Sequence, residues 1–265
     1  MLCFRMDDFP GDVRFLGGVR SGIDIYNSYR KEMTMRMMIS WPALLVLAVL
    51  SGCNSYVRTV HLVPGAQATD VYLDNKLILK NMCYKDVGCY TKACKGCRNL
   101  KFKPIGQDSP SLLDVKIKLE SDAYMTLVAM GTDLNCTEGV LYCDDRIVDS
   151  YKARIRIIHA SPDSPPMDIA LIPVSRDAGQ TETQPADSEY MPFRELCFRD
   201  ASIYNEFDPG DYTLQSRSVE SGEIILNIPV MTFCEGTNYT IFIIGQCEKN
   251  SLAAMSVIDA QESWE

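Results

Sequence analysis

Four cysteines stand close together in the sequence and could supply thiolate ligands to a metal ion. They are Cys83, Cys89, Cys94 and Cys97. Tetrahedral zinc takes four such ligands, usually as two closely spaced pairs, and only Cys94 and Cys97 have the two-residue spacing of a pair. Three alternatives therefore stay open for this cluster, which are a zinc site, disulfides among these residues, and free thiols.

The two histidines of the chain occur in one repeated frame, with an arginine, a proline and an aspartate at the same spacing. The frames are Arg58-x-x-His61-x-x-Pro64-x5-Asp70 and Arg156-x-x-His159-x-x-Pro162-x5-Asp168. We favour a structural interpretation, in which the histidine ends a strand, the proline turns the chain, and the aspartate accepts backbone N–H bonds as the next strand begins. The alternative is that His159, Asp163 and Asp168 converge on a metal ion or a sugar.

A thiol at the end of an apolar leader is a candidate for lipid attachment. The leader covers residues 33–52, and its apolar run, residues 39–50, is too short to span a bilayer comfortably. Its end, Leu50-Ser51-Gly52-Cys53, resembles a bacterial lipobox, in which the cysteine is diacylated and becomes the first residue of the mature protein. We therefore expect a lipoprotein signal peptide at 33–52 and a lipidated Cys53.

Residues 1–32 precede the leader and show no apolar period, so we expect them to be a mis-called upstream extension.

Charge and length narrow the class of protein. The 265 residues include 26 basic and 35 acidic side chains, for a net charge of −9, which argues against a nucleic-acid partner. With 46% hydrophobic residues, the chain has enough apolar material for one large domain or two smaller ones.

The histidine frames belong to a longer internal repeat. They are offset by 98 residues, whereas a second match, of 83–90 with 197–204, is offset by 114, which predicts an insertion in the second copy within 173–189. Alternating apolar and charged residues, clearest at 113–120, together with turn signals between such runs, predict an all-β fold. We expect two tandem antiparallel β-sandwiches. Their predicted ranges are 53–149 and 150–265.

These features resemble a known family. The runs that carry the resemblance are 154–170 (RIRIIHASPDSPPMDIA), Phe198-Arg-Asp200, Pro209-Gly-Asp-Tyr212 and 236–245. They are similar to the domain-of-unknown-function family numbered 4397, whose members often occur as tandem repeats in secreted and surface proteins of bacteria. The resemblance covers nearly all of 56–265, although the first copy replaces the Pro-Gly-x-Tyr turn with Cys94-Lys-Gly-Cys97 and Asp163 with Gly65. It implies immunoglobulin-like sandwiches outside the cytoplasm and no established activity.

The remaining cysteines allow further expectations in an exported protein. After Cys53, nine cysteines remain, so at least one thiol stays free or pairs between chains. Cys136 and Cys143 are close in sequence and are our candidate disulfide. Cys83 and Cys197 are repeat equivalents in different domains, and we expect them to be buried thiols.

The sequence contains no Gly-rich phosphate loop, nucleophile elbow or metalloprotease motif, so we expect neither an enzyme nor a cofactor. The expected protein is a non-catalytic cell-envelope lipoprotein, anchored to the membrane by lipid and facing outside the cytoplasm. It would serve as a binding or structural module for a wall polymer, a glycan or a surface protein. The alternative is a metal-handling lipoprotein that uses the cysteine cluster or the His159 turn.

Overall fold

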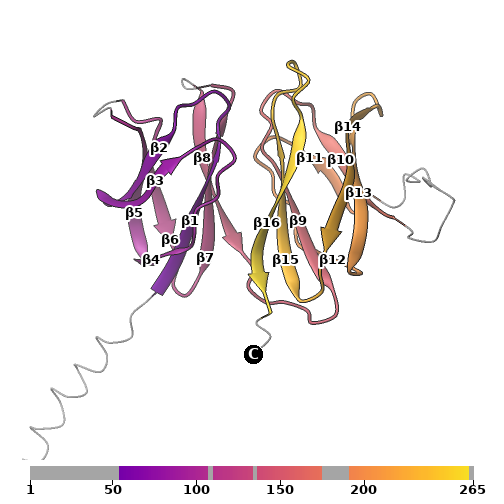
Figure 1. The fold of residues 1–265 in the computed structure, drawn as a ribbon, viewed down its shortest axis with the longest axis horizontal. Coiled ribbons are helices and arrows are strands. Elements are labelled where there is room, and N and C mark those ends of the chain that lie inside the picture. The colour runs from indigo at the N-terminus through magenta and orange to yellow at the C-terminus, as the bar shows by residue number, and fades with distance from the viewer. Residues whose placement is uncertain (1–53, 107–109, 134–135, 175–190, 263–265) are drawn as a thin grey trace, which may run out of the picture. The chain divides into compact units, whose positions relative to one another are not determined.

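The computed structural model describes residues 54–106, 110–133, 136–174 and 191–262. Within these ranges the chain forms sixteen β-strands and no helix, so the expected all-β class is confirmed. This part of the chain thus contains no helix that is long and apolar enough to cross a membrane. Residues 53–265 form one compact unit, and the strands of this unit make two β-sandwiches (Figure 1).

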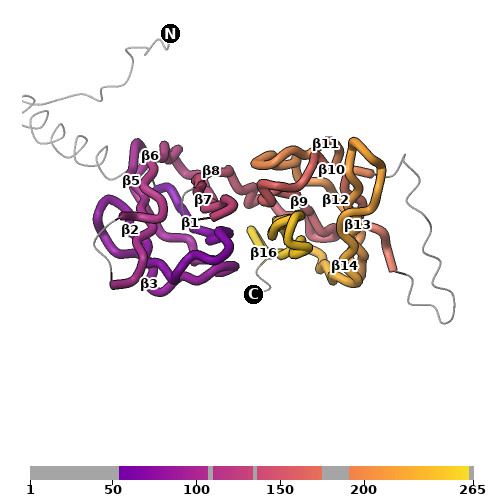
Figure 2. Tube along the Cα trace, turned by 90° about the horizontal axis from the view of Figure 1, so that it is seen from above, coloured from indigo at the N-terminus to yellow at the C-terminus, as the bar shows by residue number. Residues whose placement is uncertain are grey.

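The first sandwich has eight strands. They are β1 (Asn54–Leu62), β2 (Thr69–Leu73), β3 (Lys76–Met82), β4 (Thr91–Cys94), β5 (Gly96–Pro104), β6 (Leu113–Leu119), β7 (Tyr124–Gly131) and β8 (Thr137–Asp144). One sheet has the order β4-β1-β7-β8, which we call the inner sheet, and the other has the order β3-β2-β5-β6, the outer sheet. Figure 2 shows β1, β7 and β8 on one side of this sandwich and β2, β3, β5 and β6 on the other.

The second sandwich repeats this plan. Its strands are β9 (Ala153–His159), β10 (Met167–Pro173), β11 (Phe193–Leu196), β12 (Asn205–Phe207), β13 (Gly210–Ser218), β14 (Ile224–Phe233), β15 (Thr237–Ile244) and β16 (Ala253–Gln261). Its inner sheet has the order β12-β9-β15-β16 and its outer sheet the order β11-β10-β13-β14. Every strand has a counterpart at the same place in the first sandwich, which supports the internal repeat inferred from the sequence.

The burial patterns explain why the sheets differ in sequence. In β13, buried and half-buried residues alternate, because one face of an outer sheet covers the core and the other meets solvent. In β7 and β15 nearly every residue is buried, so both faces of these strands are covered. One face packs on the core of its own sandwich, and the other packs on a third apolar cluster formed by both inner sheets.

One strand pair in each inner sheet departs from the expected antiparallel arrangement. β1 pairs in parallel with β7, and β9 pairs in parallel with β15. The paired strands are far apart in the sequence, so the intervening chain can return to the same end of the sheet before it pairs. The inner sheets are therefore mixed, whereas the outer sheets are antiparallel.

The second sandwich is longer than the first between its second and third strands. β2 and β3 are joined by the two-residue turn Asp74-Asn75, in which both residues have left-handed φ values of 49° and 66°. β10 and β11 are joined by a much longer segment that includes the predicted insertion, of which residues 175–190 lie outside the described residues. The predicted domain boundary near residue 149 lies between β8 and β9.

Candidate functional site

Each sandwich contains a histidine frame and a Cys-x-x-Asp motif, which is 83–86 in the first sandwich and 197–200 in the second. The two lie side by side. In the first, the backbone N–H of His61 donates to the carbonyl of Asp86 (3.1 Å), and the N–H of Lys85 donates to the carbonyl of His61 (2.8 Å). In the second, His159 makes the equivalent pair of bonds at 3.0 and 2.8 Å. The histidine frame and the Cys-x-x-Asp motif are therefore parts of one structural unit.

The Cys-x-x-Asp motif is a capped turn. The backbone N–H of Cys83 donates to the carboxylate of Asp86 at 2.7 Å, and that of Cys197 donates to Asp200 at 2.9 Å. The residue before each aspartate, a lysine or an arginine, has a left-handed φ of 73° or 78°. The carboxylate holds the turn in this conformation by satisfying a backbone N–H that would otherwise lack a partner.

Both histidine rings are fully buried, and burial lowers the pKa of His61 to about 4 and also lowers that of His159. Each ring accepts, at Nδ1, the backbone N–H of the residue two positions later at 3.3 Å. Nε2 of His159 lies 3.2 Å from the hydroxyl of Ser164 and 3.4 Å from the carbonyl oxygen of Pro165. Nε2 of His61 is buried and has no hydrogen-bond partner among the described residues.

The aspartates of the frames bond to backbone groups. Asp70 and Asp168 each accept an N–H of the neighbouring strand, at 3.0 and 2.8 Å. Asp163 accepts two N–H groups of the loop after β15, at 2.9 and 3.2 Å. Ser161 bonds to both His159 and Asp163, through its N–H and its hydroxyl at 3.3 Å each, whereas Asp168 bonds to Glu195 on another strand. These side chains are thus engaged with groups of the protein itself. The prolines of the frames, at the turns that follow the histidines, are Pro64 and Pro162.

The described cysteines are all free thiols, and eight of the nine are exposed. Cys83 and Cys89 lie between β3 and β4, while Cys94 lies in the inner sheet and Cys97 in the outer sheet. Among the described residues, no group of three His, Cys, Asp or Glu side chains is arranged to hold a metal ion. The four thiolates of the expected cluster are therefore not brought together as a zinc site.

Two other expectations about cysteines are wrong. Cys136 directly precedes β8 and Cys143 is the last residue but one of that strand, so about seven extended residues, or ~23 Å, separate them. A disulfide needs Cα atoms within about 7 Å, which rules out this pair. Cys83 and Cys197 are exposed instead of buried, because each begins its capped turn at the surface. The lipidation candidate, Cys53, lies outside the described residues.

A buried arginine reaches from each sandwich into the other. Arg58 on β1 forms an ion pair with Asp259 on β16, and its Nη1 donates to the carbonyl of Ile258 at 2.8 Å. Arg156 on β9 forms the reciprocal ion pair with Asp144 on β8, with 2.6 Å between Nη2 and Oδ1, and its Nη1 likewise donates to the preceding carbonyl at 2.6 Å. All four side chains are at most 4% exposed, so water screens these pairs very little.

Each of the two aspartates is also bonded within its own sandwich. Asp259 accepts the hydroxyls of Tyr204 (2.7 Å) and Thr240 (2.6 Å). In both sandwiches the tyrosine ring lies under the guanidinium, 4.7 Å from ring centroid to Cζ, and burial beside the aspartate raises the pKa of the tyrosine. The residues that surround Asp144 in the same way are Tyr90 (2.7 Å) and Thr126 (2.5 Å).

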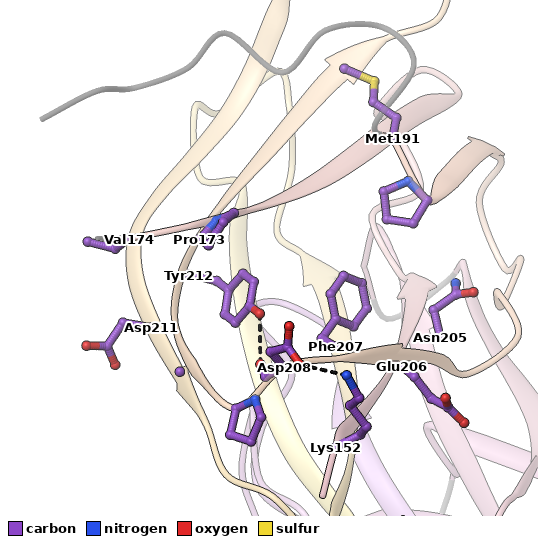
Figure 3. Close-up of a pocket in the computed structure, with 13 residues that line it drawn as sticks. Lys152, Pro173, Val174, Met191, Asn205, Glu206, Phe207, Asp208, Asp211 and Tyr212 are labelled. Carbon is purple, nitrogen blue, oxygen red and sulfur yellow. Dashed lines mark hydrogen bonds and ion pairs between the residues drawn. The ribbon is translucent and has the colours of Figure 1, made fainter. Parts of the chain in front are cut away.

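A pocket of about 630 Å³ opens in the second sandwich (Figure 3). The rings of Phe207 and Tyr212 line it and meet edge-on, with centroids 6.0 Å apart. Nζ of Lys152 donates to the carboxylate of Asp208 at 2.6 Å, and the hydroxyl of Tyr212 donates to the carbonyl of Asp208 at 2.7 Å. Other lining residues are Pro173, Met191, Pro192, Asn205, Glu206 and Asp211.

The first sandwich has a different side chain at the equivalent turn. Arg98 stands where the second sandwich has Tyr212, and its Nε donates to the carbonyl of Cys94 at 2.9 Å. That carbonyl lies four residues upstream of the donor, as the carbonyl of Asp208 does in the second sandwich. Nη1 of Arg98 also pairs with Asp74 at 3.2 Å. The turn is thus held in both sandwiches by side chains of different chemistry.

Comparison with protein families finds a match that covers the first sandwich and the start of the second. Residues 55–170 match the sequence model of DUF4397, which is described as a domain of unknown function. The resemblance to this family is confirmed. The DUF4397 match begins in β1 and ends in β10, so the likeness expected for 171–265 lies outside it. A search of curated proteins found no match to the chain.

The DUF4397 match includes both buried arginines, whose role the sequence reasoning missed. The sequence does contain a sign of this role. Arg58 and Arg156 hold the same position in the two histidine frames, and Tyr90 and Tyr204 hold the same position in the internal match of 83–90 with 197–204. Charged residues inside apolar β-runs need buried partners. Those partners lie in distant strands of the opposite sandwich, which the frames themselves do not indicate.

Proposed function

We propose that this chain is a lipid-anchored, non-catalytic binding module of the bacterial cell envelope. Acyl chains on Cys53 would hold it on the membrane, since two or three chains together give durable anchoring where one does not. The leader and lipobox of the sequence support this anchor. β1 begins at Asn54, the next residue, so the anchored first sandwich would lie at the membrane surface without a spacer.

The observation that carries the binding role is the pocket of the second sandwich. Its volume lies within the range typical of small-ligand sites, roughly 300–1,000 Å³. The half-buried ring of Phe207 presents apolar area, and the polar side chains of Asn205 and Glu206 line the same pocket. A sugar unit has an apolar ring face and several hydroxyls, so we propose a glycan or wall polymer as the ligand.

The titratable groups of the repeated frames support a structural role for those frames. Both histidine rings and the aspartates of the frames are engaged with backbone groups. The polar groups that the pocket offers to a ligand include the carboxylates of Glu206, Asp208 and Asp211. The metal-handling alternative gains no support from the arrangement of the described cysteines or of the His159 turn.

The anchor is tested by the intact mass of the protein isolated from bacterial membranes. The expected mass is that of a chain beginning at Cys53 with two or three acyl chains attached. Cys53→Ser is the control. This variant should carry no acyl mass and should be lost from the membrane fraction. Recovery of the wild-type chain from the cytosol with its leader intact would contradict the proposal.

The binding role is tested with soluble fragments of envelope polysaccharide by calorimetry. Val174 is 38% exposed and lines the pocket, so Val174→Trp should obstruct it and weaken binding at least tenfold. Val219 is 42% exposed in the same sandwich and does not line the pocket, so Val219→Trp is a matched control that should bind like the wild type. Equal binding by all three proteins would remove the pocket as the site, and no binding by the wild type would remove the ligand class.

A further inference from the structure

The inner sheets of the two sandwiches present equivalent apolar residues to one another. The third apolar cluster draws on the same strand positions in both sandwiches, which makes the two contact faces alike instead of merely complementary. The first sandwich contributes Val60, Leu62, Val128 and Met130, and the second contributes Ile158, Ala160, Phe242 and Ile244.

The ion pairs across this contact are reciprocal. The inner sheet of the first sandwich carries a buried cation, Arg58, and a buried anion, Asp144, and the second carries Arg156 and Asp259 in the same roles. Each inner sheet therefore holds both halves of the pair that it makes with its partner. A surface that pairs in this reciprocal way has the property of an isologous interface, which is self-complementary about a two-fold axis.

We propose that the inner sheet of each sandwich is a docking surface that accepts a second copy of this chain. In the exchanged dimer, the first sandwich of one chain pairs with the second sandwich of its neighbour through Arg58–Asp259, and also through Arg156–Asp144. Two contacts of this kind would form in the dimer, so no apolar face and no buried charge would be left without a partner.

The hinge for such an exchange is the connection between β8 and β9. It has eight residues, from the end of β8 at Asp144 to the start of β9 at Ala153. Both forms contain the same contacts, so the balance between them depends on how strongly the connection concentrates one sandwich near the other. Short linkers give effective concentrations in the millimolar range, so the closed monomer dominates in dilute solution and exchange needs crowding or an altered hinge.

The hinge provides the first test. Removal of residues 148–150 shortens the reach of the connection by about 10 Å, which opposes closure within one chain but not pairing between two. At micromolar concentration, light scattering should give a monomer for the wild-type chain and a dimer for the shortened chain. A shortened chain that stays folded and monomeric would overturn the proposal.

Two controls separate the proposed surface from unspecific association. The shortened chain with Arg58→Ala and Arg156→Ala should return to a monomer while circular dichroism keeps its strand signal. A dimer that survives both substitutions would show that another surface associates and would overturn the proposal. The outer-sheet control, Lys101→Ala in the shortened chain, should leave the dimer intact, because that lysine pairs with Asp114 away from the contact.

A second measurement leaves the hinge at full length and decides the question if the shortened chain does not fold. One chain carries Arg58→Asp and Arg156→Asp, and the other carries Asp144→Arg and Asp259→Arg. Each chain alone places like charges together on closure, whereas sandwiches from different chains meet with opposite charges. An equimolar mixture should form a dimer that neither chain forms alone. A mixture that stays monomeric would overturn the proposal.

Discussion

In the first sandwich the guanidinium of Arg98 donates to the carbonyl of Cys94, and in the second the hydroxyl of Tyr212 donates to the carbonyl of Asp208. Two unlike residues thus hold the same turn. The arginine also pairs with Asp74, while the tyrosine ring lines the pocket. The difference indicates that the fold requires a donor at this position and leaves the chemistry around it free to diverge.

The two buried histidines make the same point in the interior. Ser161 and Ser164 surround His159, whereas the equivalent positions near His61 are Val63 and Ala66, which have no side-chain polar group. The backbone bonds of both histidines are nevertheless the same. The strand and its turn are maintained by backbone pairing, and only the second sandwich completes the hydrogen bonds of the ring.

The largest effect is expected where the two sandwiches are most alike. Arg58→Ala or Arg156→Ala leaves a buried carboxylate without its cation, so each should lower the free energy of unfolding by about 3–5 kcal/mol. Urea denaturation of the two variants checks the prediction. Lys101→Ala, which removes a half-buried partner of Asp114 on the outer sheet, is the control and should cost less than about 1 kcal/mol. Clearly unequal costs for the two arginines would contradict their equivalence.

The next effect is a loss of stability in acid, to which His61 should contribute. Because burial lowers the pKa of His61 from 6.5 to about 4, the unfolded chain binds a proton in this range that the folded chain does not. Stability should therefore fall as the pH drops from about 6.5 to about 4, by about 3 kcal/mol from this residue. The unfolding free energy of His61→Gln, measured across the same range, should lack this contribution. An unchanged pH profile in that variant would assign the acid sensitivity to other groups.

A smaller effect tests the two turn donors. Tyr212→Phe removes the hydroxyl that bonds to the carbonyl of Asp208 and should cost about 1–1.5 kcal/mol. Arg98→Ala should cost less, because the arginine side chain is 27% exposed and water can replace it. Thermal unfolding of both variants provides the comparison. A larger loss for Arg98→Ala would mean that its ion pair with Asp74 matters more than the exposure suggests.

The smallest effect would make the first sandwich resemble the second. Ala66 is the equivalent of Ser164, so Ala66→Ser places a hydroxyl where Nε2 of His61 lacks a partner. The gain in stability should be about 1 kcal/mol, the usual net value of one hydrogen bond. Ser164→Ala should lose a similar amount, measured by urea denaturation. Destabilisation by Ala66→Ser would show that the two loops place this residue differently.

Local patterns were sufficient to predict the all-β class, some of the strands and the repeated turns. Alternation at Leu113–Leu119 and the spacing from His61 to Asp70 report on neighbours within a few residues, and the structure places strands and turns there. The contact of Arg58 with Asp259 joins residues 201 positions apart, and no local period encodes such a distance. Spacing also misled the disulfide prediction, because Cys136 and Cys143 are near in sequence but are held apart by an extended strand.

The parallel pairing of β1 with β7 has a mechanical consequence. Seven residue pairs join the two strands, from Tyr56 with Tyr124 to Leu62 with Met130. A pull on the amino end of β1, along the strand, would load all of these hydrogen bonds in shear at once instead of unzipping them singly. A chain tethered just before Asn54 would therefore resist drag from its surroundings at the very strand where the tension enters.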